Sequence, residues 1–117
     1  MKMNPELRKE TLTKLVSMYF KMYYPDCKKD VEIKGKSKKW KFDILLEKES
    51  GEKYGVVIKD WVRTLGVNQV RQLQKACHDI PLEGGVLISN AFSPSAISFG
   101  KRFGISCYNR YEILSKL

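Results

Sequence analysis

The chain has 117 residues, a length that fits one domain with its own hydrophobic core and is too short for two. Its composition, 43% hydrophobic and 30% charged, is that of a folded globular protein, and no apolar run approaches the roughly 18 to 20 residues that a membrane-spanning helix needs. Twenty-two Lys and Arg against thirteen Asp and Glu give a net charge of +9, which favours a polyanionic partner such as nucleic acid.

The first ten positions, MKMNPELRKE, lack the apolar centre and the small-residue cleavage site of a secretory signal. We therefore expect a cytoplasmic protein. Three cysteines at wide spacing and a single histidine, His78, include no pair with the spacing of a zinc site, so a structural zinc is not expected. Reduced, partly buried thiols are the expected state.

An amphipathic helix is predicted from Pro5 to about Tyr23. Its apolar residues recur at spacings of three and four, which places them on one face of a helix. These residues are Leu7, Leu12, Leu15, Val16, Met18, Tyr19 and Met22. Asn4 is the expected capping residue, and a proline suits the first turn.

Three strands joined by short turns are predicted next, at 30–34, 41–47 and 54–59. Strands connected in this way pair antiparallel. The third strand is rich in Val and is expected to be buried. Five lysines lie within eight residues around Trp40, in and beside the turn between the first two strands. Their charges repel one another, and phosphate groups would relieve that repulsion. These lysines are Lys34, Lys36, Lys38, Lys39 and Lys41.

The second half of the chain alternates helices and strands. We predict a helix that follows Gly66 and runs to about Asp79, a strand over 85–89, a helix that is capped by Ser93 and ends at Gly104, a strand over 105–108 and a short terminal helix capped by Asn109. Strands separated by helices imply crossover connections and parallel pairing. The predicted fold class is α/β, with a mixed sheet flanked by helices and a core order of α-β-β-β-α-β-α-β.

Three stretches carry a family resemblance: FDILLEKESGEKYGVVIKDW, LGVNQVRQLQKAC and GGVLISNAFSPSAISFGKRFGISCYNRYEIL. They resemble the catalytic domain of Mrr-like restriction endonucleases, within the PD-(D/E)xK nuclease superfamily. The resemblance runs from about Pro5 onward, and its most specific part is the C-terminal stretch, which carries no catalytic residue. It implies a single restriction-endonuclease-like domain over 1–117 and indicates fold more securely than function.

The resemblance implies a metal-binding aspartate on the second strand and a catalytic lysine at the end of the third, which Asp43 and Lys59 match. A carboxylate between apolar neighbours is expensive to bury, so Asp43 is expected to point to a cleft. The alternatives are a solvated aspartate at a strand edge and an exposed surface lysine. Where the family has Glu or Gln, this chain has Val57, which shares a face with Lys59 and offers no oxygen.

Further site residues follow from the same resemblance. The backbone carbonyl of Ile58 is an implied metal ligand, and Glu10 matches a first-helix glutamate that would hold a metal-bound water. A solvated Glu10 on a charged helix face is the alternative. Asp60 is expected on the opposite face from the lysine. Gln69 lies within the apolar arc of its helix and, with Gln72, is a candidate contact to DNA.

These residues favour a metal-dependent DNA endonuclease with a degenerate active site, using Mg²⁺ or Mn²⁺ at Asp43 and Ile58, with Lys59 orienting the attacking water. One alternative is a nuclease fold in which Asp43 and Lys59 form a residual ion pair and DNA is bound without cleavage, through Lys36, Lys38, Lys39 and Arg63. Another is a protein-interaction module. A homodimer would suit cleavage of both strands, although nothing in the sequence proves one.

Overall fold

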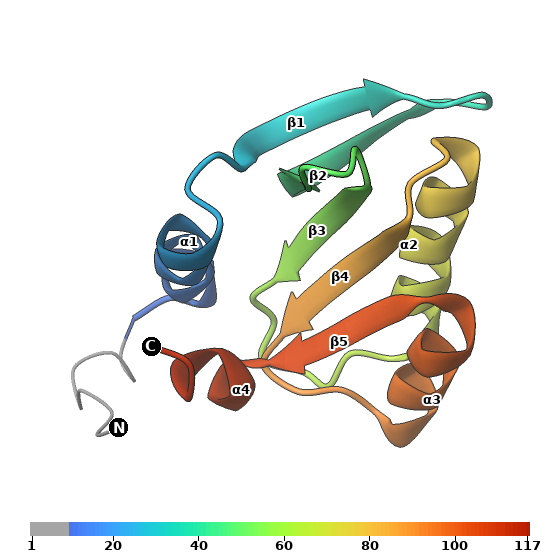
Figure 1. Cartoon of the computed structure of the whole chain (residues 1–117). Helices are drawn as coiled ribbons and strands as arrows, with labels where there is room; N and C mark the ends of the chain where they lie inside the picture. The colour runs from blue at the N-terminus through green and yellow to red at the C-terminus, as the bar shows by residue number, and fades with distance from the viewer. Residues whose placement is uncertain (1–9) are drawn as a thin grey trace.

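The computed structural model describes residues 10–117 (Figure 1). In chain order its elements are α1 (Leu12–Tyr23), β1 (Lys28–Lys34), β2 (Lys39–Glu47), β3 (Lys53–Lys59), α2 (Val67–Asp79), β4 (Gly84–Ser89), α3 (Pro94–Phe103), β5 (Ile105–Asn109) and α4 (Arg110–Leu114). Within this described part of the chain, no helix has both the length and the apolar character that crossing a bilayer requires.

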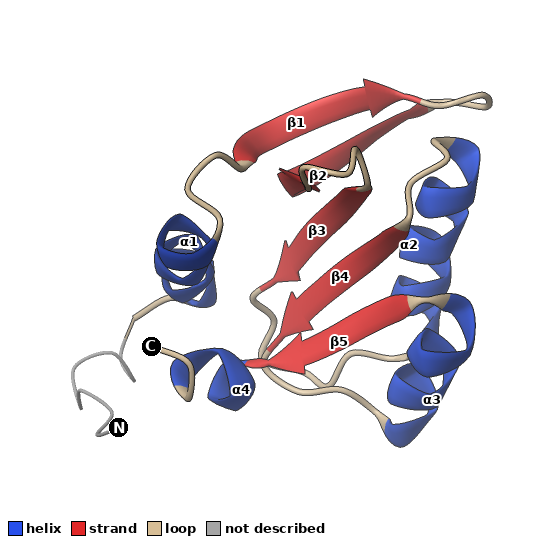
Figure 2. Cartoon of the chain, in the orientation of Figure 1, coloured by secondary structure: helices blue, strands red, loops and turns tan. Residues whose placement is uncertain are grey.

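The strands form one mixed sheet in the order β1-β2-β3-β4-β5. The three early strands pair antiparallel, and β3, β4 and β5 pair parallel. The two parallel connections pass through α2 and α3, as crossovers between parallel strands require (Figure 2). The predicted α/β class, with a mixed sheet flanked by helices, is confirmed.

Helices cover both faces of this sheet and bury two apolar clusters. On one face α1 and α4 contribute to a cluster of Leu12, Leu15, Val16, Phe20, Ile44, Leu46, Val56, Ile88, Ile113 and Leu114. On the other, α2 and α3 contribute to a cluster of Phe42, Leu65, Val70, Leu73, Ala76, Leu87, Ala96 and Ile105. Full burial of one Leu or Ile side chain stabilises a fold by roughly 1.5–3 kcal/mol, so both layers hold the sheet in place.

The first helix begins at Leu12, later than the sequence pattern predicts. The predicted cap and first turn, Asn4 and Pro5, lie outside the described residues. Within them, the Thr11 hydroxyl caps the helix by accepting the N–H of Lys14 at 3.2 Å. The carbonyl of Glu10 accepts a side-chain N–H of Arg110 at 2.6 Å, so a tertiary contact takes an acceptor that a longer helix would have used.

The predicted ends of the later helices are confirmed. The Ser93 hydroxyl caps α3, and Asn109 caps α4 in a reciprocal capping box with Glu112. Gly104 ends α3 with a φ of 75°, a conformation that suits a residue without a side chain.

β2 and β3 separate where the candidate site begins. Their pairing stops at Ile44 and Val56. Alternation along β2 also breaks there, since Phe42 packs with the cluster under α2 and α3 while Ile44 packs with the cluster under α1 and α4. The ladder between β1 and β2 omits the pair formed by Asp43 and Asp30, and Asp30 has a φ of 50°. We call this separation of the two strands the β2–β3 fork.

Candidate functional site

Asp43 lies in the β2–β3 fork. One of its carboxylate oxygens, Oδ2, accepts the backbone N–H of Ile58 at 2.7 Å. The strand ladder has ended here, so the carboxylate satisfies an N–H that would otherwise lack a partner on β2. The side chain is half-buried, and its other oxygen has no hydrogen-bond donor among residues 10–117. Asp43 therefore retains one oxygen for a ligand.

Val57 and Lys59 line the same small cavity of about 120 Å³ between the sheet and α2, as strand alternation predicts. Val57 packs against the apolar cluster on this face and offers no oxygen. The ammonium of Lys59 lies 5.4 Å from the ring centroid of Trp61. The described ion pairs do not include one between Asp43 and Lys59, so the residual pair expected under the binding-module alternative is absent.

Glu10 lies near the carboxyl end of β3, where Lys59 also lies. The N–H of Leu12 donates to Asp60 at 3.1 Å, which fixes the start of α1 against this end of the strand. The Glu10 carboxylate is 3.3 Å from the ammonium of Lys14. Glu10 precedes α1, so it does not lie on a helix face as expected, and its side chain pairs with Lys14. A role in holding a metal-bound water stays a prediction.

Asp60 points to the opposite face of the sheet, as alternation predicts. It accepts the amide of Asn90 at 2.9 Å and the N–H of Leu12, and it lies 3.6 Å from the guanidinium of Arg110. The hydrogen bond from Asn90 is the largest cause that lowers the pKa of Asp60 below its usual value. The hydrogen bond from the Leu12 N–H and the positive charge of Arg110 lower it further. Asp60 therefore anchors α1 and does not replace the carboxylate missing at position 57.

The residues at the fork do not fit a preformed divalent-metal site. Asp43 supplies one carboxylate, and Val57 occupies the position of the second. No group of three or more His, Cys, Asp or Glu side chains within 10–117 is arranged to hold a metal ion. Mg²⁺ and Mn²⁺ prefer several oxygen ligands in octahedral geometry. Asp43 and the carbonyl of Ile58 remain the predicted ligands, without the acidic partner that the family pattern provides.

Two cavities lie beside α2. The small cavity beside Val57 and a second cavity of about 410 Å³ have different α2 residues in their walls, and Trp40 is the one residue that lines both. We call the two together the Trp40 groove. Its cationic side chains are those of Lys59 in the first cavity and of Lys38 and Lys75 in the second, where His78 also lies. Within the described chain none of these three lysines is in an ion pair.

Asp79 holds the lysine-rich turn between β1 and β2 against the end of α2. Its carboxylate accepts the indole N–H of Trp40 at 2.7 Å and the backbone N–H of Ser37 at 2.9 Å. The bond from Trp40, followed by those from Ser37, holds the pKa of Asp79 below its usual value. The ammonium of Lys38 lies 4.2 Å from the Trp40 ring centroid. The turn therefore presents its lysines in a fixed position.

The remaining predicted DNA contacts are distributed around this groove. Lys36 lies in the same turn, where its N–H donates to the carbonyl of Asp79 at 3.2 Å, whereas the ammonium of Lys39 is 3.9 Å from Glu32 on the neighbouring strand. The guanidinium of Arg63 lies 4.4 Å from the Trp61 ring, on the side of the fork.

Two glutamines of α2 face the fork. Gln69 is half-buried, and both Gln69 and Gln72 line the cavity that contains Val57 and Lys59. Neither amide has a hydrogen-bond partner in the described part of the chain. Sequence reasoning identified these two residues and missed Lys75, whose only sequence signal is its place on the same helix.

A family model described as a restriction endonuclease, of the Mrr catalytic type, matches residues 5–117. The chain belongs to the Mrr-type restriction endonuclease family. A comparison with curated proteins found no match.

Solved structures share the fold of this Mrr-type domain. A protein of unknown function designated AF1548 superposes with a TM-score of 0.75 at 16% identity, over 90% of this chain and 65% of its own length. A repair endonuclease from Pyrococcus abyssi gives 0.58 at 13% identity, over 86% and 47%. Apo EndoMS gives 0.56 at 15% identity, over 86% and 46%. The Mrr-type chain thus spans about two thirds of the first neighbour and less than half of the other two.

Proposed function

We propose that this member of the nuclease family binds DNA along the Trp40 groove without hydrolysing it. The observation that carries the proposal is the row of lysines without acidic partners that lines the groove, from Lys59 at the fork to Lys38 and Lys75 near the end of α2. We expect no hydrolysis because Val57 stands where the family pattern has a metal ligand, and its side chain offers no oxygen. EndoMS, which shares the fold, has been solved in complex with double-stranded DNA.

The two cavities together cover a length suited to several phosphates. A helix rises about 1.5 Å per residue, so the α2 residues that line one cavity or the other, from Gln69 to His78, cover about 14 Å along the helix axis. Phosphates follow one another about every 3.4 Å of rise along one DNA strand, so about four nucleotides would face the groove. Lysines that contact phosphates release counterions, so binding should weaken steeply as salt rises.

Most of these contacts carry no sequence information, because phosphate contacts position a protein without reading bases. Gln69 and Gln72 are the exceptions, since a glutamine amide can pair with the edge of an adenine. We expect binding with little sequence preference and a modest contribution from these two amides.

Binding and cleavage are tested on the same DNA molecules. Gel shifts with a duplex, a single strand and a four-way junction should show binding that weakens steeply with salt. The salt concentration is varied from about 50 to about 200 mM, the range over which phosphate contacts lose most of their affinity. Supercoiled plasmid incubated with Mg²⁺ or Mn²⁺ should stay intact. A lack of binding to all three DNAs at the lowest salt would refute the proposal and favour a protein-interaction module.

The second candidate function is the metal-dependent endonuclease. The retention of Asp43 and Lys59 at the fork favours it, since both are positions that the family resemblance assigns to catalysis. Nicking of plasmid by the wild type that disappears in both Asp43→Ala and Lys59→Ala would select this candidate. This candidate also predicts a homodimer, because two sites related by symmetry suit the cleavage of two DNA strands. Sedimentation of the protein with and without duplex DNA tests for the dimer.

A further inference from the structure

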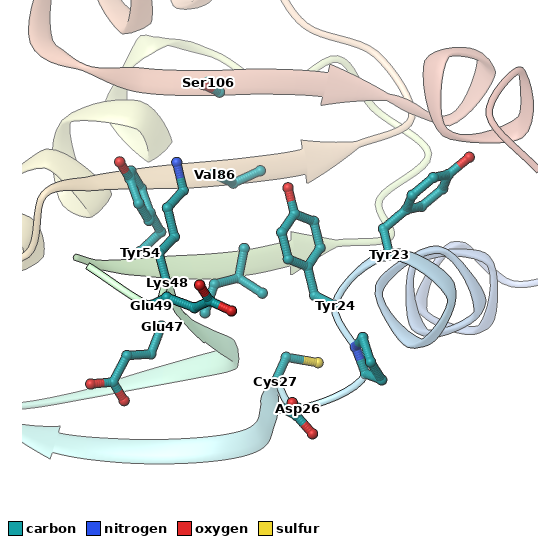
Figure 3. A pocket seen from close by; sticks show the side chains of 12 residues that line it. Tyr23, Tyr24, Asp26, Cys27, Glu47, Lys48, Glu49, Tyr54, Val86 and Ser106 are labelled. Carbon is teal, nitrogen blue, oxygen red and sulfur yellow. The ribbon is translucent and has the colours of Figure 1, made fainter. Parts of the chain in front are cut away.

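A second hollow, a cavity of about 560 Å³, lies on the sheet face opposite the Trp40 groove (Figure 3). It is bounded by the end of α1, the segment that enters β1, the turn between β2 and β3, and the central strands. Its wall residues Tyr54 and Val86 pack with the cluster under α1 and α4, whereas Trp40 and Val57 pack with the cluster on the other face. The cavity is therefore separate from the proposed DNA site.

Tyrosine rings form much of the wall, and we call this hollow the tyrosine cavity. Tyr24 is 41% exposed and stands upright beside the opening, while Tyr54 lies across the cavity from it (Figure 3). The ammonium of Lys48 already lies 5.0 Å from the ring centroid of Tyr54. Ring faces attract cations through the quadrupole of the π system. The wall thus already holds one alkylammonium group, the side chain of Lys48, against the ring of Tyr54.

The charges that line the cavity have the sign opposite to that of the whole protein. Three acidic residues line it, Asp26, Glu47 and Glu49, and none of them is in an ion pair within the described residues. The carboxylate of Glu49 extends toward Tyr24, whereas those of Asp26 and Glu47 lie at the rim and point outward (Figure 3). The lining includes one cation, Lys48, which lies 4.0 Å from Glu52. In a chain with a net charge of +9, this local excess of carboxylates repels phosphate and attracts cations.

We propose that this cavity binds alkylammonium groups, carried either by a free polyamine or by lysine side chains of a peptide. The ammonium would lie against the ring of Tyr24 and pair with Glu49, whose carboxylate extends toward that ring (Figure 3). The alkyl chain would rest on Leu46 and Val86, which supply apolar wall. This site goes beyond the proposed DNA binding and does not depend on it.

The test is a titration of the whole chain, followed by ¹H–¹⁵N correlation NMR, with spermidine in one arm and an acetylated, amidated pentalysine in the other. Sodium chloride at matched ionic strength is the blank. Amide signals of residues 24, 26, 27, 47–49 and 54 should shift, and those of 74–79 should not. A shift with spermidine alone identifies a free polyamine as the source, and tighter binding of the peptide identifies a protein.

Matched variants test the named contacts. Glu49→Gln should weaken binding roughly two- to fivefold, the range expected for one exposed ion pair, whereas Glu32→Gln, which removes the same charge from an exposed residue of β1 outside the lining, should not. Tyr24→Leu should weaken it by a similar factor and Tyr24→Phe should retain it, because the ring face remains. Equal losses in Glu49→Gln and Glu32→Gln, or no shift at the cavity in either arm, would overturn the proposal.

Discussion

The carboxylate of Asp43 on β2 accepts the N–H of Ile58 on β3 at 2.7 Å and bridges the two strands where their ladder has ended. The contact fixes one carboxylate oxygen in the fork and leaves the other free of protein donors in residues 10–117. The neighbouring Val57 and Lys59 are presented side by side in the cavity next to it. The fork and the cavity beside it thus retain Asp43 and Lys59, to which the family resemblance assigns catalysis, and lack an acidic residue at position 57.

Restoring the missing carboxylate should therefore restore chemistry. We expect Val57→Glu to bind Mn²⁺ and to nick supercoiled plasmid at least about tenfold faster than the protein-free background, at which the wild type should remain; tenfold is the lower end of the effect that even an indirect metal partner has on activity. Calorimetry with Mn²⁺ and plasmid nicking measure the two effects. Val57→Met controls for the length of the side chain without adding an oxygen or a charge. Nicking that survives Asp43→Ala in the Val57→Glu background would show that the fork is not the site.

Loss of groove lysines should change the salt dependence of DNA binding. Each phosphate contact contributes about 0.9 to the slope of log K against log salt, so Lys38→Ala with Lys75→Ala should lower the slope by about 1.8. Lys21→Ala with Lys28→Ala removes two exposed lysines outside the groove lining and is the matched control. Equal slopes for the two double variants would place the DNA elsewhere on the surface.

Asp79 should contribute to stability in a pH-dependent way. Its pKa is lowered in the folded protein, chiefly by the N–H of Trp40, so its contribution is fully present above the usual value of 3.8 and is lost as the pH falls through the lower folded value. We expect Asp79→Asn to be less stable than wild type in urea at pH 7, and the difference to shrink in strong acid. Fluorescence of Trp40 in a Trp61→Phe background reports the contact. A pH-independent difference would contradict this account.

Asp60 should stabilise the attachment of α1. Asp60→Ala removes the acceptor for Leu12 and the partner of Arg110, and we expect a loss of roughly 1–2 kcal/mol in the free energy of unfolding, allowing for solvent screening of a partly exposed group. Asp60→Asn keeps an oxygen acceptor and should lose less. Urea denaturation followed by circular dichroism measures both. The same stability for Asp60→Ala and wild type would show that α1 docks through its apolar face alone.

The cysteines should differ in reactivity. Burial raises the pKa of Cys77 and of Cys107 to about 11, so at pH 8 only about one thousandth of each thiol is the reactive thiolate. Cys27 lines the open tyrosine cavity and should be alkylated first by iodoacetamide, with spermidine slowing that reaction. Mass spectrometry of the digested protein measures all three. Faster labelling of Cys77 or Cys107 would show that their surroundings open in solution.

The elements of the fold follow from local patterns in the chain. Apolar spacing predicted the helices, Ser93, Asn109 and Gly104 marked helix ends that the structure confirms, and the order of strands and helices indicated antiparallel pairing first and parallel pairing later. These features depend on neighbours a few residues apart, so the sequence alone carries them. The start of α1 did not follow, because Arg110 and Asp60 determine it from distant parts of the chain.

The candidate site divides in the same way. The sequence by itself determined that Val57 and Lys59 share one face of β3 and that Val57 offers no oxygen there, because strand alternation is a local property. The tertiary structure decided that Asp43 bonds to Ile58, that Lys59 lies over Trp61 instead of pairing with Asp43, and that Lys75 joins the turn around Trp40. It also created the tyrosine cavity. Such contacts join residues far apart in the chain, and only the packing of helices on a twisted sheet sets their distances.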